Sequence, residues 1–411
     1  MMDSIMNFMK TKFAPKVNKM TNNPWISAVQ SSMLTGLPLV FVGSIITMIS
    51  ILNNHFDWMP DFSLISTFSF GLFGIIIAFF LPYYVMENKG HSNNKLVAGA
   101  TSLALYLMLI FPDISDEQIT FTLSRFGIEG MVVAIVSGLF VGAVMSFMAS
   151  KSFFSEDSEI PDFVIRWFDN ILPITFIILI GWLFIFQLKI DLFQVIQNIF
   201  KPITKIVSTF PGFVLATFFQ SFVYSFGISG WIFFPVFYPI FMSNLAENMA
   251  AVAAGGVATR VATQETLYAL IYIGGTGTTL ALAIMMAFLS KSKRLKAIGK
   301  AVILPSIFNI NEPVIFGAPI AFNPYLMVPM WLCGLIIPSI VYLIMSLGWV
   351  NIPSATFLLW YLPYPLPSYF ATQDWRGIIW CVIIFLISLL IYYPFFRVYD
   401  ESLLQEEQKE H

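Results

Sequence analysis

The chain has 411 residues, of which 58% are hydrophobic, 17% aromatic and only 11% charged. Because a soluble domain carries roughly 25% charged residues, this composition excludes an ordinary water-soluble globular fold. The formal net charge of −2, with no basic patch, gives no indication of nucleic-acid binding.

Long runs without charge predict helices that cross a membrane, since about 20 apolar residues span the core of a bilayer. The candidate spans of the first half cover 25–52, 62–86, 96–112, 130–150 and 170–188. The lysines that precede the first run place the amino terminus in the cytoplasm. Five crossings then leave the chain outside near residue 190.

The middle of the chain does not fit simple crossings. Residues 291–300 carry five positive charges and no acid, which predicts a cytoplasmic amphipathic surface helix. An odd number of crossings must therefore precede it, yet only two strong spans are visible, within 206–246 and at 266–290. Because "FGISG" interrupts the first and 248–265 is too small and polar to face lipid, one or both regions are predicted to be broken or re-entrant.

The carboxyl-terminal third is also irregular, with nine prolines from Pro313 to Pro367. A span at 325–347, an irregular piece at 349–373 and a last span at 377–396 precede a glutamate-rich cytoplasmic tail. Non-helical backbone is tolerated at membrane depth only where protein buries it or where it lines a wet cavity. Two such regions therefore predict a cavity of the kind that transporters contain.

Glu312 is the only charged residue between Lys300 and Asp374. An acid at bilayer depth costs a few kcal/mol and usually marks a substrate or proton pathway. The alternative is a structural brace held by helix-end amides or by an arginine. Asn311 beside it offers both a donor and an acceptor, which suits hydroxyl groups. Pro313 predicts a hairpin tip or a helix break at this point.

Three further candidates have structural alternatives. Gly275 and Thr276, in "YIGGTGTTLAL" (272–282), could let the backbone approach a ligand, although such residues also pack membrane helices together. Trp360, in "LLWYLPYPLPSYF" (358–370), could stack on the C–H face of a sugar ring or belong to an interfacial aromatic belt.

Arg260 and Glu265 lie in the polar middle stretch and are expected to form a salt bridge with each other or with Glu312. Cys333 and Cys381 lie inside apolar runs without metal-site spacing, so both are expected to be buried, inert thiols. No motif indicates a metal or a cofactor.

At "NEPVIFGAPIAFNP", preceded by "ILPSIF", the chain resembles the sugar-translocating IIC component of bacterial phosphotransferase systems, lactose/cellobiose/diacetylchitobiose group. The glycine-rich segment and residues 79–107 are similar to the same family. The resemblance implies an all-α polytopic membrane protein, a homodimer with about ten transmembrane helices, two re-entrant hairpins and amphipathic surface helices. It also implies a scaffold and dimerisation region at 1–190, a transport region at 191–397 and a cytoplasmic tail at 398–411.

By this resemblance the protein is a permease of the bacterial inner membrane, with both termini cytoplasmic. The resemblance implies that it carries a β-linked disaccharide or related glycoside and presents the sugar's 6-hydroxyl to a phosphocysteine on a separate IIB protein. A IIA protein takes part indirectly, through IIB. Glu312 takes the catalytic and sugar-binding role. The other substrate-binding residues are Ser229, Gly275, Thr276, Asn311 and Trp360.

One departure from the family leaves alternatives open. The family reads "FGIHG" where this chain has "FGISG", so Ser229 replaces a histidine beside the hydroxyl that receives phosphate. Imidazole accepts a proton near neutral pH and an isolated serine hydroxyl does not. The alternatives are a permease without phosphoryl transfer, or a non-transporting membrane sensor that kept the fold.

Overall fold

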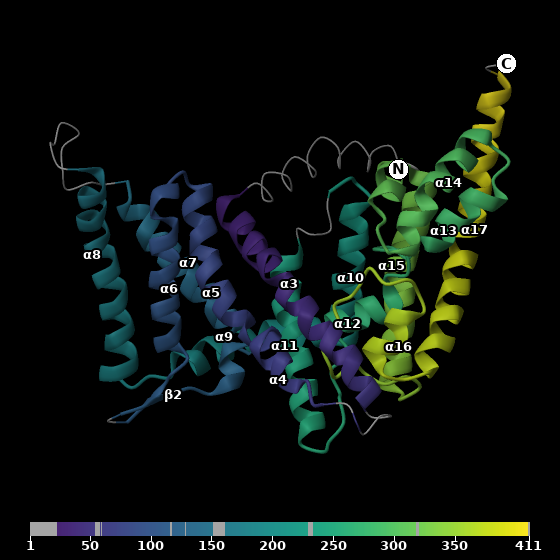
Figure 1. Ribbon diagram of the computed structural model, residues 1–411. Coiled ribbons are helices and arrows are strands. Elements are labelled where there is room, and N and C mark those ends of the chain that lie inside the picture. The colour runs from purple at the N-terminus through teal and green to yellow at the C-terminus, as the bar shows by residue number, and fades with distance from the viewer. Residues whose placement is uncertain are drawn as a thin grey trace. The chain divides into compact units, whose positions relative to one another are not determined.

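The computed structural model describes residues 23–53, 58, 60–115, 117–127, 129–150, 161–228, 233–317 and 320–409 (Figure 1). Predictions for the basic amino-terminal segment and for Ser229 lie outside these residues. Two compact units are present. One holds residues 23–46 and 61–203, and the other holds the described part of 47–60 together with 204–409.

The first unit is a group of helices with one short β-hairpin. Its elements are α3 (Pro24–Asn53, up to Ile46), α4 (Ser63–Phe68), η2 (Phe70–Leu72), α5 (Phe73–Asn88), η3 (Ser92–Asn94), α6 (Lys95–Leu109), β1 (Asp113–Ile114), β2 (Ile119–Thr120), η4 (Leu123–Phe126), α7 (Met131–Met148), α8 (Asp162–Trp182), η5 (Leu183–Gln187) and most of α9 (Leu192–Ser208). Helix α5 packs against α6 and α7, and α6 packs against α8.

Small residues explain why α7 lies so close to α5. A Cβ atom added at Gly138 would stand 2.9 Å from the side chain of Leu81. One added at Gly142 would stand 2.9 Å from Val85. Small residues at a helix contact let membrane helices approach closely, so the glycines of α7 form its packing face.

Four predicted spans of this unit are confirmed as helices, namely those at 25–52, 96–112, 130–150 and 170–188. The prediction of one continuous span at 62–86 is wrong, because α4 ends at Phe68 and the short turn η2 separates it from α5. Beyond α6, β1 and β2 form a two-stranded antiparallel pair in which Asp113 faces Thr120.

The second unit holds the irregular elements. These are the end of α9, α10 (Phe210–Tyr224), α11 (Phe234–Ala253), α12 (Gln264–Thr266), η7 (Leu267–Ile271), α13 (Leu280–Leu289), α14 (Lys293–Ile307), η8 (Pro313–Gly317), α15 (Pro324–Ser346), α16 (Leu366–Thr372) and α17 (Arg376–Lys409). Helix α15 packs against α10 and α17, and α13 packs against α14 and α17. Both cysteines are buried, as predicted.

The predicted breaks are present as breaks in the helices. Helices α9 and α10 are bent by 81° at their junction, and α10 ends in a turn at Ser225–Gly227. Residues 254–263 contain no helix. The prediction of one continuous span at 266–290 is wrong, because η7 ends at Ile271 and the glycine-rich segment 272–279 forms a loop before α13.

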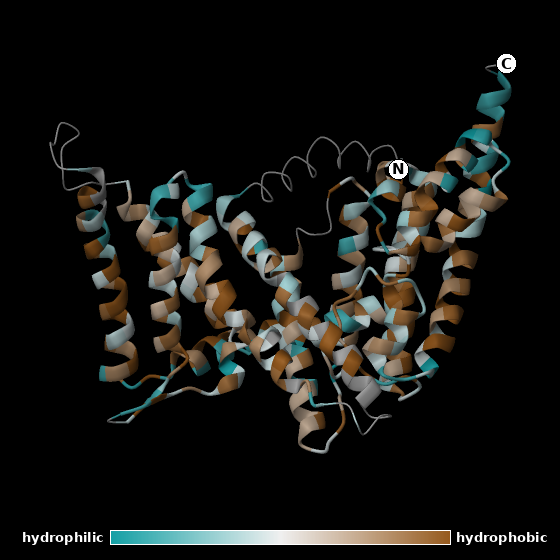
Figure 2. Cartoon of the chain, viewed as in Figure 1, coloured by the Kyte–Doolittle hydropathy of each residue, from teal (hydrophilic) through white to brown (hydrophobic). Residues whose placement is uncertain are grey.

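Hydropathy supports membrane insertion. Among the described residues, four helical segments are long and apolar enough to cross a membrane: Met131–Met148, Trp167–Gln187, Pro324–Ser346 and Arg376–Lys409. The bent pair of α9 and α10 also passes this test if it is taken as one span. Hydrophilic residues gather at the carboxyl-terminal end of α17 (Figure 2).

That acidic end of α17 holds the start of α14. Asp400 is fully buried and accepts hydrogen bonds from the backbone N–H groups of Lys291, at 2.8 Å, and Ser292, at 3.0 Å. Glu407 accepts from Ser292 Oγ at 2.6 Å and from the Arg294 N–H at 2.9 Å. The hydrogen bond from Ser292, aided by that from the Arg294 amide, holds the pKa of Glu407 below its usual value. Both carboxylates therefore satisfy N–H groups that a helix start leaves open.

Candidate functional site

One pocket lies inside the second unit, where its interrupted elements meet. Its empty space, with the open solvent at its mouth included, is about 790 Å³. It is lined by Gln220 and Tyr224 of α10, Phe233, Phe234, Phe237, Tyr238 and Phe241 at and in α11, Gln264, Tyr268 and Tyr272 of the α12–η7 region, Gly275 and Thr276 of the glycine-rich loop, Asn309, Asn311 and Glu312 after α14, and Trp360.

The glycine-rich loop forms one wall through backbone that only glycine adopts easily. Gly275 has a φ of +99°, and a Cβ atom there would stand 2.4 Å from Cγ of Asn311. The Asn311 side chain therefore lies directly against this glycine and donates from Nδ2 to the carbonyl of Thr276 at 2.8 Å. The loop therefore takes one hydrogen bond from the amide nitrogen of Asn311, and Oδ1 is the atom of this side chain that is able to accept one.

Glu312 is exposed, lines the pocket and lies beside Tyr224, whose phenol interacts with its carboxyl group. No arginine or lysine of the described residues forms an ion pair with it. The described residues therefore do not support the alternative in which an arginine holds Glu312 as a structural brace. The carboxyl group lies open to the pocket, where a ligand can reach it.

Trp360 lies half-buried at the pocket, in the irregular segment between α15 and α16. Its carbonyl accepts a hydrogen bond of 2.6 Å from Asn309 Nδ2. The Tyr361 ring meets its indole edge-on, with the ring centroids 5.9 Å apart. The next turn of this segment is held by Tyr364, whose hydroxyl donates to the carbonyl of Tyr268. The backbone of Trp360 is therefore tied to Asn309, and the turn that follows it is tied to Tyr268.

Gln220 and the aromatic residues of the lining other than Trp360 had no separate signal in the sequence. The hydroxyl of Tyr272 donates to Gln220 Oε1 at 3.0 Å, which joins η7 to α10. The rings of Phe233 and Phe237 stack with centroids 5.7 Å apart, one helical turn from each other on α11. The pocket thus has polar groups on the loop side and an aromatic wall from α11, a combination that suits a molecule with both hydroxyl groups and C–H faces.

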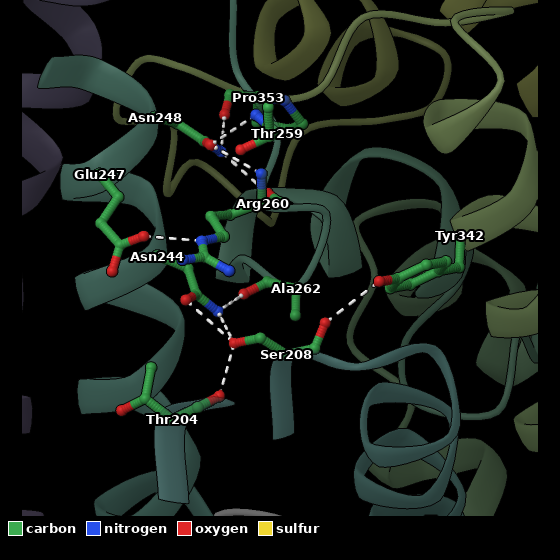
Figure 3. Close-up of polar contacts among 10 residues, drawn as sticks. All are labelled: Thr204, Ser208, Asn244, Glu247, Asn248, Thr259, Arg260, Ala262, Tyr342 and Pro353. Atoms are coloured by element: carbon green, nitrogen blue, oxygen red, sulfur yellow. Dashed lines mark hydrogen bonds and ion pairs between the residues drawn. The ribbon is translucent and has the colours of Figure 1, made fainter. Parts of the chain in front are cut away.

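The expected pairing of Arg260 is wrong. Its Nε donates to Glu247 of α11 at 2.6 Å, and both side chains are exposed (Figure 3). Asn248, also on α11, accepts hydrogen bonds from the N–H groups of Thr259 and Arg260 and so fixes the extended backbone there. Glu265 is instead fully buried and accepts from the Phe357 N–H at 3.3 Å. Among the described residues it has no ion pair.

A neighbouring cluster on the same helix explains this arrangement (Figure 3). Asn244 Nδ2 donates to the carbonyl of Ala262 and to Ser208 Oγ, both at 2.7 Å. Tyr342 donates to the carbonyl of Ser208 at 3.1 Å. The polar face of α11 therefore holds the segment 259–262, and Arg260 is directed to Glu247 rather than into the pocket.

Five of the six predicted site residues line this single pocket: Gly275, Thr276, Asn311, Glu312 and Trp360. The sixth, Ser229, lies outside the described residues. Asn309 was not predicted. The signal available for it was the position of an asparagine directly after an amphipathic helix, where asparagine often ends the helix in left-handed backbone.

The sequence profile of the family described as phosphotransferase system, EIIC, matches residues 30–334. The chain belongs to this family. As an EIIC protein it is an integral membrane permease, which agrees with its apolar helices.

Relatives of this EIIC protein match along nearly its whole length. It is 28% identical over 440 residues to the cellobiose-specific EIIC component of Geobacillus stearothermophilus, with 99% of this chain and 97% of that one covered. It is 27% identical over 419 residues to the lactose-specific EIICB component of Staphylococcus haemolyticus, with 97% of this chain and 71% of that one covered.

The fold also matches a solved structure. The crystal structure of ChbC, the IIC component of the N,N'-diacetylchitobiose-specific phosphotransferase system, aligns with a TM-score of 0.88 at 25% identity. The alignment covers 98% of this chain and 99% of that chain. The EIIC fold predicted from the sequence is therefore confirmed, whereas the ten-helix count and the two re-entrant hairpins stay predictions.

Proposed function

We propose that this EIIC protein is a permease for a β-linked disaccharide or related glycoside, and that a separate IIB protein phosphorylates the sugar during uptake. The observation that carries the proposal is the pocket in which Glu312, without an ionic partner among the described residues, lies with Asn311 and Trp360. The sugars after which these relatives are named, cellobiose, lactose and N,N'-diacetylchitobiose, are disaccharides and support this substrate class.

Each site residue has a distinct part in this proposal. The carboxyl group of Glu312 and the Oδ1 of Asn311 accept hydrogen bonds from sugar hydroxyls. Trp360 stacks on the C–H face of a sugar ring. Gly275 lets the loop backbone approach the sugar, and Thr276 contributes its hydroxyl. Ser229 contacts the same sugar as a hydrogen-bonding residue.

Phosphoryl transfer would take place at the sugar's 6-hydroxyl. The new P–O bond forms as the P–S bond of the phosphocysteine on IIB breaks, and the hydroxyl proton passes to the carboxylate of Glu312. With Ser229 in place of the family histidine, we assign the role of base to Glu312, the carboxylate that lines the pocket among the described residues. The fused EIICB relative supports a IIB protein as the partner, since the matched region covers only 71% of that protein.

Transport would require the region 191–397 to move relative to a scaffold formed by 1–190, with 398–411 as a cytoplasmic tail. The proposed protein is a homodimer in the bacterial inner membrane, with about ten spanning helices, two re-entrant hairpins and both termini in the cytoplasm. The division of the described residues into two compact units near residue 203 supports two regions with different roles.

Uptake into membrane vesicles tests the proposal. Vesicles that contain the protein are given radiolabelled cellobiose, with and without phosphorylated IIB, and the sugar inside is separated from its phosphate ester. We expect the phosphate ester to accumulate only with phosphorylated IIB. Equal accumulation of unmodified cellobiose in both samples would contradict the phosphoryl-transfer step. No uptake of any β-linked disaccharide in either sample would contradict the permease.

A further inference from the structure

Asn309 ends helix α14 with its backbone and connects the pocket walls with its side chain. It follows the last residues of α14 with a φ of 62°, in the left-handed region. Its N–H donates to the carbonyl of Ser306 at 3.0 Å, and the N–H of Ile310 donates to that of Pro305 at 3.0 Å. This pair of bonds is a Schellman motif, which closes the end of a helix and which asparagine tolerates. The backbone at Asn309 thus stops α14 immediately before the pocket.

The side chain of Asn309 then joins three walls of that pocket. Its Oδ1 accepts from the N–H of Gly274 at 2.9 Å. Its Nδ2 donates to the carbonyl of Trp360 at 2.6 Å and to that of Leu362 at 2.8 Å. Only 7% of the residue is exposed. The amide uses both donors and its acceptor within the protein, so its own groups are occupied without a ligand.

We propose that Asn309 is a positioning residue for sugar binding: it fixes Trp360 and the glycine-rich loop relative to Glu312. The inference rests on the proposed function, because it concerns the same pocket. Asn309 lies three residues before Glu312 in the chain. The short segment after α14 therefore carries both the Glu312 carboxyl group and the Asn309 amide, which binds Gly274 and the Trp360 segment. A sugar that contacts Glu312 and stacks on Trp360 needs these two groups at a fixed separation.

A positioning residue and a purely structural residue respond differently to substitution. A brace that only stabilises the fold would lower the unfolding temperature and leave the affinity of the remaining folded protein unchanged. A positioning residue that acts through Trp360 weakens sugar binding only while the indole is present. A double-mutant cycle between the two residues separates these cases.

The experiment uses the full chain purified in detergent. Asn309→Gly keeps the left-handed backbone accessible and removes the amide. Asn309→Asp keeps the acceptor for Gly274 and removes the two donated bonds. The control is Asn323→Gly, since Asn323 caps α15 through a 3.0 Å bond from the Tyr325 N–H and does not line the pocket.

Hydrogen–deuterium exchange is measured first, without sugar, in peptides that cover 272–279 and 358–364. We expect faster exchange in both peptides for Asn309→Gly, in the second for Asn309→Asp, and in neither for Asn323→Gly. Unchanged exchange in Asn309→Gly would overturn the inference whether or not the protein binds sugar, and would leave the proposed function standing.

Cellobiose affinity is then measured for Asn309→Gly, Trp360→Leu and the double variant. Asn309→Gly removes three buried hydrogen bonds, which predicts at least roughly fivefold weaker binding for this variant alone. In the Trp360→Leu background the same change should weaken binding by a smaller factor, because only the part that acts through the glycine-rich loop remains. An equal loss in both backgrounds would overturn positioning through Trp360. If the wild-type protein binds no β-linked disaccharide, the proposed function fails and the positioning role fails with it.

Discussion

A methyl group at Gly275 should damage the pocket more than it damages the fold. In Gly275→Ala the new Cβ would stand 2.4 Å from Cγ of Asn311 and 2.7 Å from both its Nδ2 and its Oδ1. The side chain must move, which breaks the bond to the Thr276 carbonyl, worth about 0.5–1.5 kcal/mol. Alanine in left-handed backbone costs a further ~1–3 kcal/mol. The total is roughly 1.5–4.5 kcal/mol, and the side chain that moves belongs to a residue that we propose contacts the sugar.

Gly348→Ala is the matched control. Gly348 has a φ of +74°, but a Cβ atom there would meet nothing within 4 Å. Both variants therefore carry the backbone strain, and only Gly275→Ala carries the clash. We expect both to lower the thermal unfolding midpoint, and only Gly275→Ala to weaken cellobiose binding, by about tenfold or more, since small misplacements of contact groups are costly. Equal cellobiose affinity in the two variants would refute the reasoning.

Three further predictions concern the polar clusters of the second unit. Asp400→Ala removes the carboxylate that accepts hydrogen bonds from the Ser290 hydroxyl and from two backbone N–H groups, so it should lower stability by at least about 3 kcal/mol in a thermal-shift assay. The control Glu401→Gln changes an exposed acid and should unfold at the same temperature as the wild type. Because the pKa of Glu407 is lowered in the folded protein, its carboxylate stabilises the fold above about pH 4.5, and this stabilisation is lost as the pH falls through the lower folded-state pKa. At pH values below 4.5 the melting temperature of the wild type should therefore decrease, and that of Glu407→Gln should decrease less. Arg260→Met breaks an exposed ion pair and should cost under about 1 kcal/mol without changing cellobiose affinity; a large loss of affinity would place Arg260 at the site after all.

Charge and hydropathy were sufficient to predict most helices and the acid of the pocket. Apolar runs bounded by charges marked the helices of the first unit, because a membrane span needs a minimum length. Glu312 stood out because no other charge occurs between Lys300 and Asp374. Asn311 and Gly275 were selected through local composition and Trp360 through the family resemblance, and all three line the pocket together with Glu312.

Other features could not be read from one sequence. The loop at 272–279 was hidden, since glycine and threonine are tolerated within apolar helices and hydropathy does not register the break. The aromatic wall of α11 lies in a run whose remaining positions are also apolar, so the pocket-facing residues could not be told from the others. The partner of Arg260 depends on which extended segment α11 holds. Asn244 and Asn248 hold the segment 259–262 against α11 through hydrogen bonds that exist only in the folded chain.

The most direct test of the central claim is a calorimetric titration of cellobiose into the purified protein and its Glu312→Gln variant. The substitution keeps the shape of the side chain and removes its ability to accept two hydrogen bonds as a carboxylate. A hydrogen bond to a charged group contributes about 1.5–3 kcal/mol, so binding should weaken by roughly 10–150-fold. Glu247→Gln, which changes an exposed acid of α11, should bind as the wild type does. Wild-type affinity in Glu312→Gln would contradict the claim that this carboxyl group holds the sugar.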